Sequence, residues 1–471
     1  MGEISYVNVK ITVHSDTKLT YEPDYGVPFV AGLSAEPLTR ITIERLARWV
    51  DEDTFRCREL LQLLGKHLYH CMFGGPGSKV HESFQAAVLS LRKDANKDKR
   101  LRITLTFEKP ADSLARYPWE FLHVDGPDDD GFFIAAASTP TQLILTRLVP
   151  PPAQIVNSLE PEDRPLRILV VVSSPPDPQL SAVNADKLQV QLEKLRGEQR
   201  VDLRILKTPR YEEIKAELQP RDGRPWWPHI FHFVGHGEVR EEDVVFALRM
   251  NKSDEDYLYA QEGQRALREW VSVRKLKELF PDDHWPRLVF LHACRGAARR
   301  SYWAFASGAE TFVRAGVPAA IAMQYDISNE DADFFAQQFY ERLGEGWPVD
   351  DAVTAGRVQL AQHSAPHSWG DRSFGTPLLF LQSKQAVILR PVTRRESQSK
   401  PVEGYPCPYL GCDRRFGRTD LGQCPKCARP LQWCKFMHPC MEGDQLCETC
   451  GARLTPSPTR GPGSEGKSGF D

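Results

Sequence analysis

Two short apolar segments that each lead to a reactive side chain constrain this chain most. Residues 230–234 are followed by His236 between two glycines, and residues 288–291 lead through His292 and Ala293 to Cys294. Short apolar runs bounded by glycine are typical of buried strands. Because the carboxyl ends of neighbouring parallel strands open at the same edge of a sheet, the pattern predicts an imidazole beside a thiol. A thiolate is a nucleophile, and an imidazole can take the thiol proton.

The rest of the chain predicts an α/β fold. Residues 168–172 are a continuous, mostly β-branched run, typical of a strand that is buried on both faces. Strand and helix patterns then alternate, which predicts a mostly parallel sheet with helices on both faces. Residues 22–34 are rich in proline and glycine and are predicted to be a loop. The predicted strands are 6–13, 101–107, 168–172, 201–206, 230–236, 288–291, 318–323 and 378–380, and the predicted helices are 81–92, 182–195, 211–218, 270–280, 302–315, 331–343 and 349–362, with helical spacing also from 41 to 68.

Composition and charge narrow the classes of protein to which this chain could belong. The 471 residues are enough for two or three domains, and 41% hydrophobic residues can form a large core. A net charge of −3 gives no overall reason to expect nucleic acid or an anionic membrane as a partner. No apolar run approaches the roughly 18 residues of a spanning helix, and residues 1–16 lack the apolar core of a signal peptide. A soluble, cytoplasmic protein is therefore expected.

Several motifs resemble one protein family. The sequence His-Ala-Cys-Arg-Gly at 292–296 resembles the Gln-Ala-Cys-Arg-Gly signature of caspases, whose histidine lies about fifty residues upstream. The wider chain, from about residue 60 to 385, resembles the CHAT family, caspase-like proteases common in bacteria. The matching segments are Tyr117–Leu122, Phe233–Gly237, Gly316–Gln324 and Phe374–Leu378.

The resemblance implies a cysteine endopeptidase with a caspase-like fold. Cys294 would be the nucleophile, and His236 would be the general base and later the proton donor to the leaving amine. The backbone N–H groups of Cys294 and Gly237 would form the oxyanion hole, and catalysis would need no metal. The competing interpretation is that Cys294 is a small core residue and His236 a turn residue. The family further implies a protein substrate, such as a pore-forming or signalling protein in bacterial defence or cell death.

Three residues are candidates for substrate binding. His292 stands two residues before the cysteine, where several relatives that cleave after basic residues place an aspartate. Asp326 could supply the missing acid. Alternatively, His292 could be a structural histidine, with its ring nitrogens hydrogen-bonded, that packs beside the nucleophile. Ser174, in the segment 173–177 that leaves the strand 168–172, is expected to form another wall of the pocket.

Cysteines cluster near the end of the chain. Eight of the eleven cysteines fall between residues 407 and 450, in pairs that suit two tetrahedral zinc sites. The spacing is similar to that of a double zinc ribbon, in which two structural Zn²⁺ ions replace a hydrophobic core. His438 could replace Cys440 as a ligand. A local basic excess would serve contact with protein or with nucleic acid. The predicted ligands are Cys407, Cys412, Cys424 and Cys427 for one ion and Cys434, Cys440, Cys447 and Cys450 for the other.

The expected organisation has five parts. These are an N-terminal, degenerate caspase-like half (1–150), a catalytic caspase-like half (151–385), a linker (386–403), a double zinc ribbon (404–454) and a disordered tail (455–471). The alternatives to a protease are a non-catalytic scaffold, whose zinc ribbons tether a protein or nucleic-acid complex, and a thiol-dependent transferase that uses the same two side chains.

Overall fold

The computed structural model divides the chain into two compact units, Met1–Pro391 and Val392–Asp471. The segments it describes are 5–52, 57–93, 99–126, 131–137, 142–150, 165–198, 200–219, 226–240, 243–259, 267–281, 284–295, 303–364, 372–382, 405–406, 415–416, 431–433 and 439–441. The predicted linker 386–403, the predicted tail 455–471 and most of the predicted zinc ribbon lie outside these residues.

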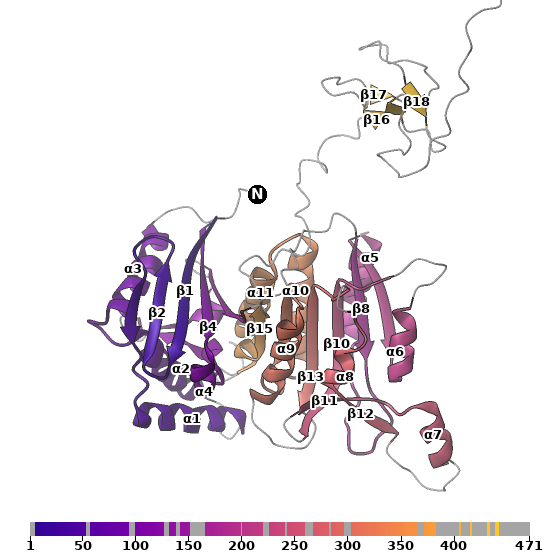
Figure 1. Cartoon of the computed structure of the whole chain (residues 1–471), viewed down its shortest axis with the longest axis horizontal. Coiled ribbons are helices and arrows are strands. Elements are labelled where there is room, and N and C mark those ends of the chain that lie inside the picture. The colour runs from indigo at the N-terminus through magenta and orange to yellow at the C-terminus, as the bar shows by residue number, and fades with distance from the viewer. Residues whose placement is uncertain are drawn as a thin grey trace, which may run out of the picture. The chain divides into compact units, whose positions relative to one another are not determined.

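The first unit is built on a single 13-stranded sheet (Figure 1). Its described strands form seven parallel and five antiparallel pairings, so the prediction of a mostly parallel sheet is confirmed. The neighbours run β12-β11-β10-β13-β14-β15-β7-β4-β1-β2-β3, with β8 beside β10 and β9 beside β8. The strands are β1 (Ser5–Ser15), β2 (Lys18–Pro23), β3 (Phe29–Gly32), β4 (Lys99–Phe107), β7 (Leu143–Leu148), β8 (Leu166–Val172), β9 (Val201–Lys207), β10 (Ile230–Arg240), β11 (Asp243–Arg249), β12 (Arg268–Ser272), β13 (Leu288–Arg295), β14 (Ala319–Met323) and β15 (Pro377–Leu381).

Helices cover both faces of this sheet, as the buried strands require. Strand β10 alternates between two cores: Ile230 and Val234 belong to one, and Phe231 and Phe233 to the other. The first core is completed by α1, α2, α3, α5, α10 and α11, and the second by α6, α8 and α9. The helices are α1 (Pro37–Asp51), α2 (Arg58–Phe73), α3 (Lys79–Lys93), α4 (Asp112–Ala115), α5 (Asp186–Gly197), α6 (Tyr211–Glu217), α7 (Lys252–Tyr259), α8 (Val273–Lys277), α9 (Trp303–Ala315), α10 (Asn329–Gly344) and α11 (Val349–Ser364), with 3₁₀ turns η1 (Lys109–Ala111), η2 (Trp119–Phe121), η4 (Ile134–Ala136) and η5 (Ser373–Gly375) and the small strands β5 (His123–Val124) and β6 (Phe132–Phe133).

Strands β2 and β7 are absent from the predicted strands, and two others, β3 and β12, replace a predicted loop and part of a predicted helix. The predicted loop 22–34 contains β3, because residues 29–32 pair with β2 at the edge of the sheet. The predicted helix 270–280 begins as β12, whose residues 268–272 pair with β11, and only α8 is helical there. In both places pairing with a partner strand overrides a local pattern.

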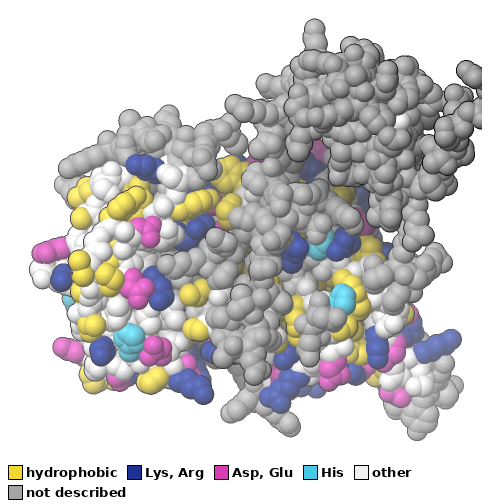
Figure 2. Space-filling model, turned by 45° about the horizontal axis from the view of Figure 1, so that its top comes forward, with side chains coloured by type: hydrophobic (Ala, Val, Ile, Leu, Met, Phe, Trp, Pro, Cys, Tyr) yellow, Lys and Arg dark blue, Asp and Glu magenta, His cyan; other side chains and the backbone are white. Residues whose placement is uncertain are grey.

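The predicted halves 1–150 and 151–385 share one sheet. Strand β15 pairs with β14 on one side and with β7, from the N-terminal half, on the other. No helix in the described segments is long and apolar enough to cross a membrane. On the face shown in Figure 2, basic and acidic side chains are interspersed with hydrophobic and uncharged ones.

Two short antiparallel hairpins are described in the second unit. Tyr405–Pro406 (β16) pairs with Arg415–Phe416 (β17), and Leu431–Trp433 (β18) pairs with Pro439–Met441 (β19). Cys407 and Cys412 lie between the strands of the first hairpin, whereas Cys434 lies between the strands of the second and Cys440 lies within β19.

Candidate functional site

The two candidate catalytic positions lie opposite each other on adjacent strands. Strands β10 and β13 are parallel, and their register pairs His236 with Cys294 and Gly237 with Arg295. Paired positions on neighbouring strands are about 4.8 Å apart along the hydrogen-bonding direction. The structure therefore brings these two positions of the chain together, although the side chain of Cys294 is outside what it describes.

His236 lies at the point along β10 where pairing with β8 ends and pairing with β11 begins. Along the edge of β10 that faces away from β13, residues 230–234 pair with β8 and residues 237–240 pair with β11. The expectation that the strand ends at His236 is wrong, because β10 continues to Arg240 in a hairpin with β11. It is β8 that ends here, and the segment leaving it passes beside the histidine.

The imidazole of His236 is buried and oriented. Its side chain is 5% exposed, and Nε2 lies 2.7 Å from the backbone oxygen of Ser181, in the segment that follows β8. Because a carbonyl oxygen can only accept, Nε2 carries the hydrogen in this contact. The buried Nδ1 atom has no hydrogen-bond partner among the described residues. A neutral ring oriented in this way presents a lone pair at Nδ1.

The segment that holds His236 is itself anchored near β11 and β12. The hydroxyl of Ser173 donates to the oxygen of Ala247 at 2.6 Å, and the amide of Leu267 donates to the oxygen of Pro176 at 2.9 Å. These contacts fix the backbone that leads to the Ser181 oxygen.

An ion pair adds a third anchor to the same segment. It joins Asp177, whose side chain is fully buried, to Arg268 of β12, and burial lowers the pKa of this arginine. Ser174 is half-buried, and its Oγ accepts from the amide of Val183 at 3.1 Å.

His292 is packed among aromatic rings. Its side chain is 7% exposed, and burial lowers its pKa to about 4. The ring of His232 lies 6.0 Å from it and stacks on Phe290 at 4.1 Å, while the hydroxyl of Tyr340 lies 2.9 Å from Nδ1 of His232. The structure thus places His292 in a buried, uncharged environment two residues before the Cys294 position.

The other two candidates lie apart from this cluster. Gly237 is buried next to His236 on β10. Asp326 is exposed, on the segment that connects β14 to α10. Because β10, β13 and β14 are parallel, this segment leaves the sheet at the same edge as the His236–Cys294 pair.

Sequence reasoning missed the backbone oxygen of Ser181 and the Asp177–Arg268 pair. A backbone acceptor leaves no signature in residue type. Asp177 and Arg268 are about ninety positions apart, and only the folded sheet brings them together.

The candidate metal ligands are only partly described. Cys440 is buried in β19, opposite Gln432 of β18, and the other seven lie outside the described residues. In the part of the chain that the structure covers, no group of three or more His, Cys, Asp or Glu side chains is arranged to hold a metal. Along the chain, Cys407 follows β16 directly and Cys434 follows β18 directly.

Comparisons with known proteins bear on the family. A family profile described as the CHAT domain matches residues 62–438. The solved structure of the Arg-specific cysteine proteinase gingipain R aligns with a TM-score of 0.40 and 11% identity, covering 81% of this chain and 78% of that one. A Saccharomyces cerevisiae separase–securin complex aligns with a TM-score of 0.40 and 12% identity over 80% of this chain and 30% of that one. The solved complex of Porphyromonas gingivalis RgpB pro- and mature domains aligns with a TM-score of 0.38 and 11% identity. The alignment covers 73% of this chain and 77% of that one.

The match to the CHAT profile spans most of the chain and contains every element of the candidate site. The chain therefore belongs to the CHAT domain family. A comparison with curated proteins found no match.

Proposed function

We propose that this CHAT protein is a cysteine endopeptidase in which Cys294 is the nucleophile and His236 is the general base. The observation that carries the proposal is the register that pairs His236 with Cys294 on adjacent parallel strands. The contact between His236 and the Ser181 oxygen supports it further, because it leaves Nδ1 able to accept a proton. Membership of the CHAT family supports the same chemistry.

The proposed reaction needs no cofactor. His236 takes the thiol proton of Cys294, and the thiolate attacks the carbonyl carbon of the substrate. Backbone N–H groups of Gly237 and Cys294 stabilise the resulting oxyanion. When the tetrahedral intermediate collapses, the protonated imidazole gives its proton to the leaving amine. Water, deprotonated by the same ring, then hydrolyses the thioester and restores the thiol.

The proposed substrate is a protein segment that binds along the edge of β10, β13 and β14. Ser174, His292 and Asp326 are the proposed contacts for its side chains. The exposed carboxylate of Asp326 suits a basic residue, whereas His292 is buried among rings and is suited to shaping the wall of the site. A role in bacterial defence or cell death, with a pore-forming or signalling protein as the substrate, is proposed from the family resemblance.

Thiol labelling tests this proposal. A peptidyl chloromethylketone should alkylate Cys294, and His236→Ala should slow that alkylation at least about 100-fold because the base is lost. The modified residue is identified by peptide mass spectrometry. Cys71 is an internal control, since burial raises the pKa of its thiol to about 12 and keeps it protonated near neutral pH.

Cleavage by the full-length protein is the second test. Proteome-wide cleavage should disappear with Cys294→Ala while the melting temperature stays the same. Cleavage that persists in Cys294→Ala would reject the assignment. An unreactive Cys294 would favour the scaffold function instead.

We further propose that residues 404–454 bind two structural Zn²⁺ ions through Cys407, Cys412, Cys424 and Cys427 and through Cys434, Cys440, Cys447 and Cys450. Two isolated hairpins bury too little apolar surface to be stable, and thiolate coordination would supply the missing stability. The two described hairpins support this, because one of them encloses Cys407 and Cys412 and the other carries Cys434 and Cys440 in or next to its strands. We propose that this module binds a protein partner.

A further inference from the structure

The join between the two halves of the sheet is short. Strands β7 and β15 pair at two positions, Arg147 with Phe380 and Leu148 with Leu381. The pairings on either side of this join are longer: β4 and β7 pair at five positions, and so do β14 and β15. Beyond these two positions, side chains replace the backbone ladder between the halves.

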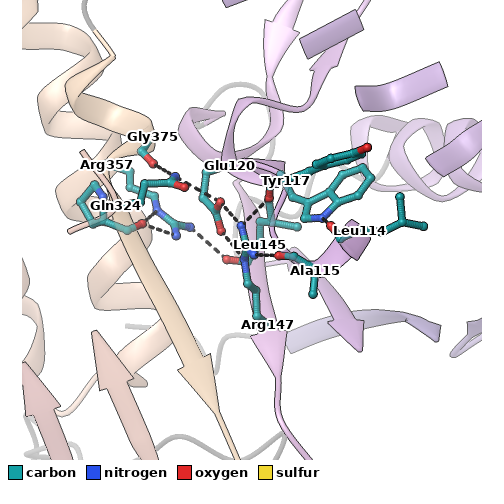
Figure 3. A network of polar contacts seen from close by, with 11 residues as sticks. Leu114, Ala115, Tyr117, Glu120, Leu145, Arg147, Gln324, Arg357 and Gly375 are labelled. Atoms are coloured by element: carbon teal, nitrogen blue, oxygen red, sulfur yellow. Dashed lines mark hydrogen bonds and ion pairs between the residues drawn. The ribbon is translucent and has the colours of Figure 1, made fainter. Parts of the chain in front are cut away.

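A buried polar network occupies this join (Figure 3). The carboxylate of Glu120, from η2 of the N-terminal half, accepts from Nε and Nη2 of Arg147 at 3.0 and 2.6 Å. The same carboxylate accepts from Nε2 of Gln324 at 3.3 Å, and that Nε2 also donates to the oxygen of Gly375 at 2.5 Å. Glu120, Arg147 and Gln324 are each at most 2% exposed. A buried contact of this kind tolerates few alternative positions.

Gln324 is the first residue after β14, and the next two residues lead into the proposed substrate-binding segment. They are Tyr325, which is buried, and Asp326, which is exposed. The ring of Tyr325 lies 5.8 Å from the ring of Phe121, the neighbour of Glu120 in η2. Two consecutive residues of η2 therefore contact two consecutive residues of the segment that carries Asp326.

A third contact involves α1 of the N-terminal half. The guanidinium of Arg372 lies 5.2 Å from the ring centroid of Tyr325 and donates to the backbone oxygens of Val50 and Asp51. Tyr325 is thus held between η2 and a side chain anchored on α1. The N-terminal half therefore contacts the segment directly through Glu120 and Phe121 of η2, and indirectly through Arg372, which is anchored on α1.

We propose that Glu120 is a positioning residue: through Gln324 it holds the 325–327 segment so that Asp326 can bind a basic side chain of the substrate. This inference rests on the proposed protease function and adds a task for the N-terminal half. Glu120 lies in η2, far along the chain from the nucleophile, and acts through Gln324. Losing the contact weakens recognition of the substrate and leaves the intrinsic reactivity of the Cys294 thiol unchanged.

Three alkylating probes separate recognition from reactivity. Iodoacetamide requires a reactive thiol alone, whereas peptidyl chloromethylketones ending in arginine or in alanine also require the binding site. Wild type should react faster with the arginyl than with the alanyl probe, and the ratio of these two rate constants is called the arginyl preference. Glu120→Gln should lower the rate constant for the arginyl probe at least about tenfold and change the iodoacetamide rate less than about twofold.

Asp350→Asn is the matched control. Asp350 of α11 is fully buried and pairs with Arg102 of β4, so this variant also removes a buried carboxylate between the halves. Because this ion pair lies on β4 and α11 rather than on η2 and the segment after β14, the variant should leave the arginyl preference intact. Gln324→Met keeps the side-chain length without the donor, and it tests the same contact if Glu120→Gln does not fold.

A double substitution tests whether the two residues act together. Asp326→Asn should remove the arginyl preference, and Glu120→Gln should cost nothing more in that background. The inference is overturned if wild type has no arginyl preference, if Glu120→Gln and Gln324→Met keep it, or if Asp350→Asn loses it equally. A wild-type Cys294 that resists all three probes would overturn the protease function itself.

Discussion

At the scale of single residues, buried histidines accompany the proposed catalytic pair. Burial lowers the pKa of His292 to about 4 and that of its neighbour His232 well below its usual value. The two rings lie on the β10 and β13 strands that carry His236 and Cys294. Protonation of either ring in the folded state would place a charge between aromatic rings, where water does not reach it.

This burial predicts how stability depends on pH. The unfolded chain binds a proton at His292 near pH 6.5, whereas the folded protein resists it until about pH 4. The stability contributed by the neutral ring is therefore complete above about pH 6.5 and is lost as pH falls toward 4. His292→Leu should make the fall of melting temperature between pH 6.5 and 4 shallower than in wild type. Thermal unfolding at a series of pH values in that range measures this dependence. If the melting temperature of His292→Leu fell with pH as steeply as that of wild type, His292 would not be a buried neutral ring with a lowered pKa.

At the scale of secondary structure, β10 and the segment after β8 form the site together. The short apolar run 230–234 is sufficient to predict the first part of β10, in which Phe231 and Phe233 face one core and Ile230 and Val234 face the other. Nothing in that pattern shows that β8 and β11 divide the same edge of β10. That division places the Ser181 oxygen beside His236, and it depends on pairing between distant segments.

Helix α11 contributes to the join between the halves through Arg357. This side chain is fully buried and donates to the oxygen of Leu145 at 2.9 Å and to that of Pro377 at 2.7 and 3.1 Å. Burial lowers its pKa to about 10, so it remains charged at neutral pH. It bridges β7 and β15 at positions where their backbones do not pair.

Removing this bridge should destabilise the first unit. Arg357→Met leaves two buried backbone oxygens without these donors, and the free energy of unfolding should fall by about 2–4 kcal/mol. The matched control is Arg196→Ala on α5, whose exposed pair with Glu193 should contribute about 0–1 kcal/mol. Urea unfolding compares the two variants, and equal losses would contradict the role of Arg357.

At the scale of the whole molecule, the chain combines a large α/β unit with a small cysteine-rich one. We propose that the two units are stabilised in different ways. Strands buried on both faces give the first unit a hydrophobic core, whereas the second has eight thiols and short hairpins. Metal coordination is the proposed substitute for a core there.

Metal analysis tests that proposal on the intact protein. Purified protein should contain two zinc ions per chain, and a strong chelator should release both while exposing eight additional reactive thiols. Elemental analysis and a thiol assay measure the two quantities. Cys424→Ser should remove one ion and leave the other. A metal-free protein whose clustered thiols react at once would contradict the zinc ribbon.

The sequence by itself determined the α/β class, most of the buried strands of the first unit and the position of His236 and Cys294 after apolar runs. These properties follow from local patterns, because side-chain periodicity decides which residues a strand or helix can bury. The tertiary structure alone decided that β7 and β15 join the halves, that Ser181 orients His236, and that Glu120 reaches Gln324 from about two hundred positions away. Such contacts depend on which distant segments become neighbours, and hydrophobic periodicity carries no information about that choice.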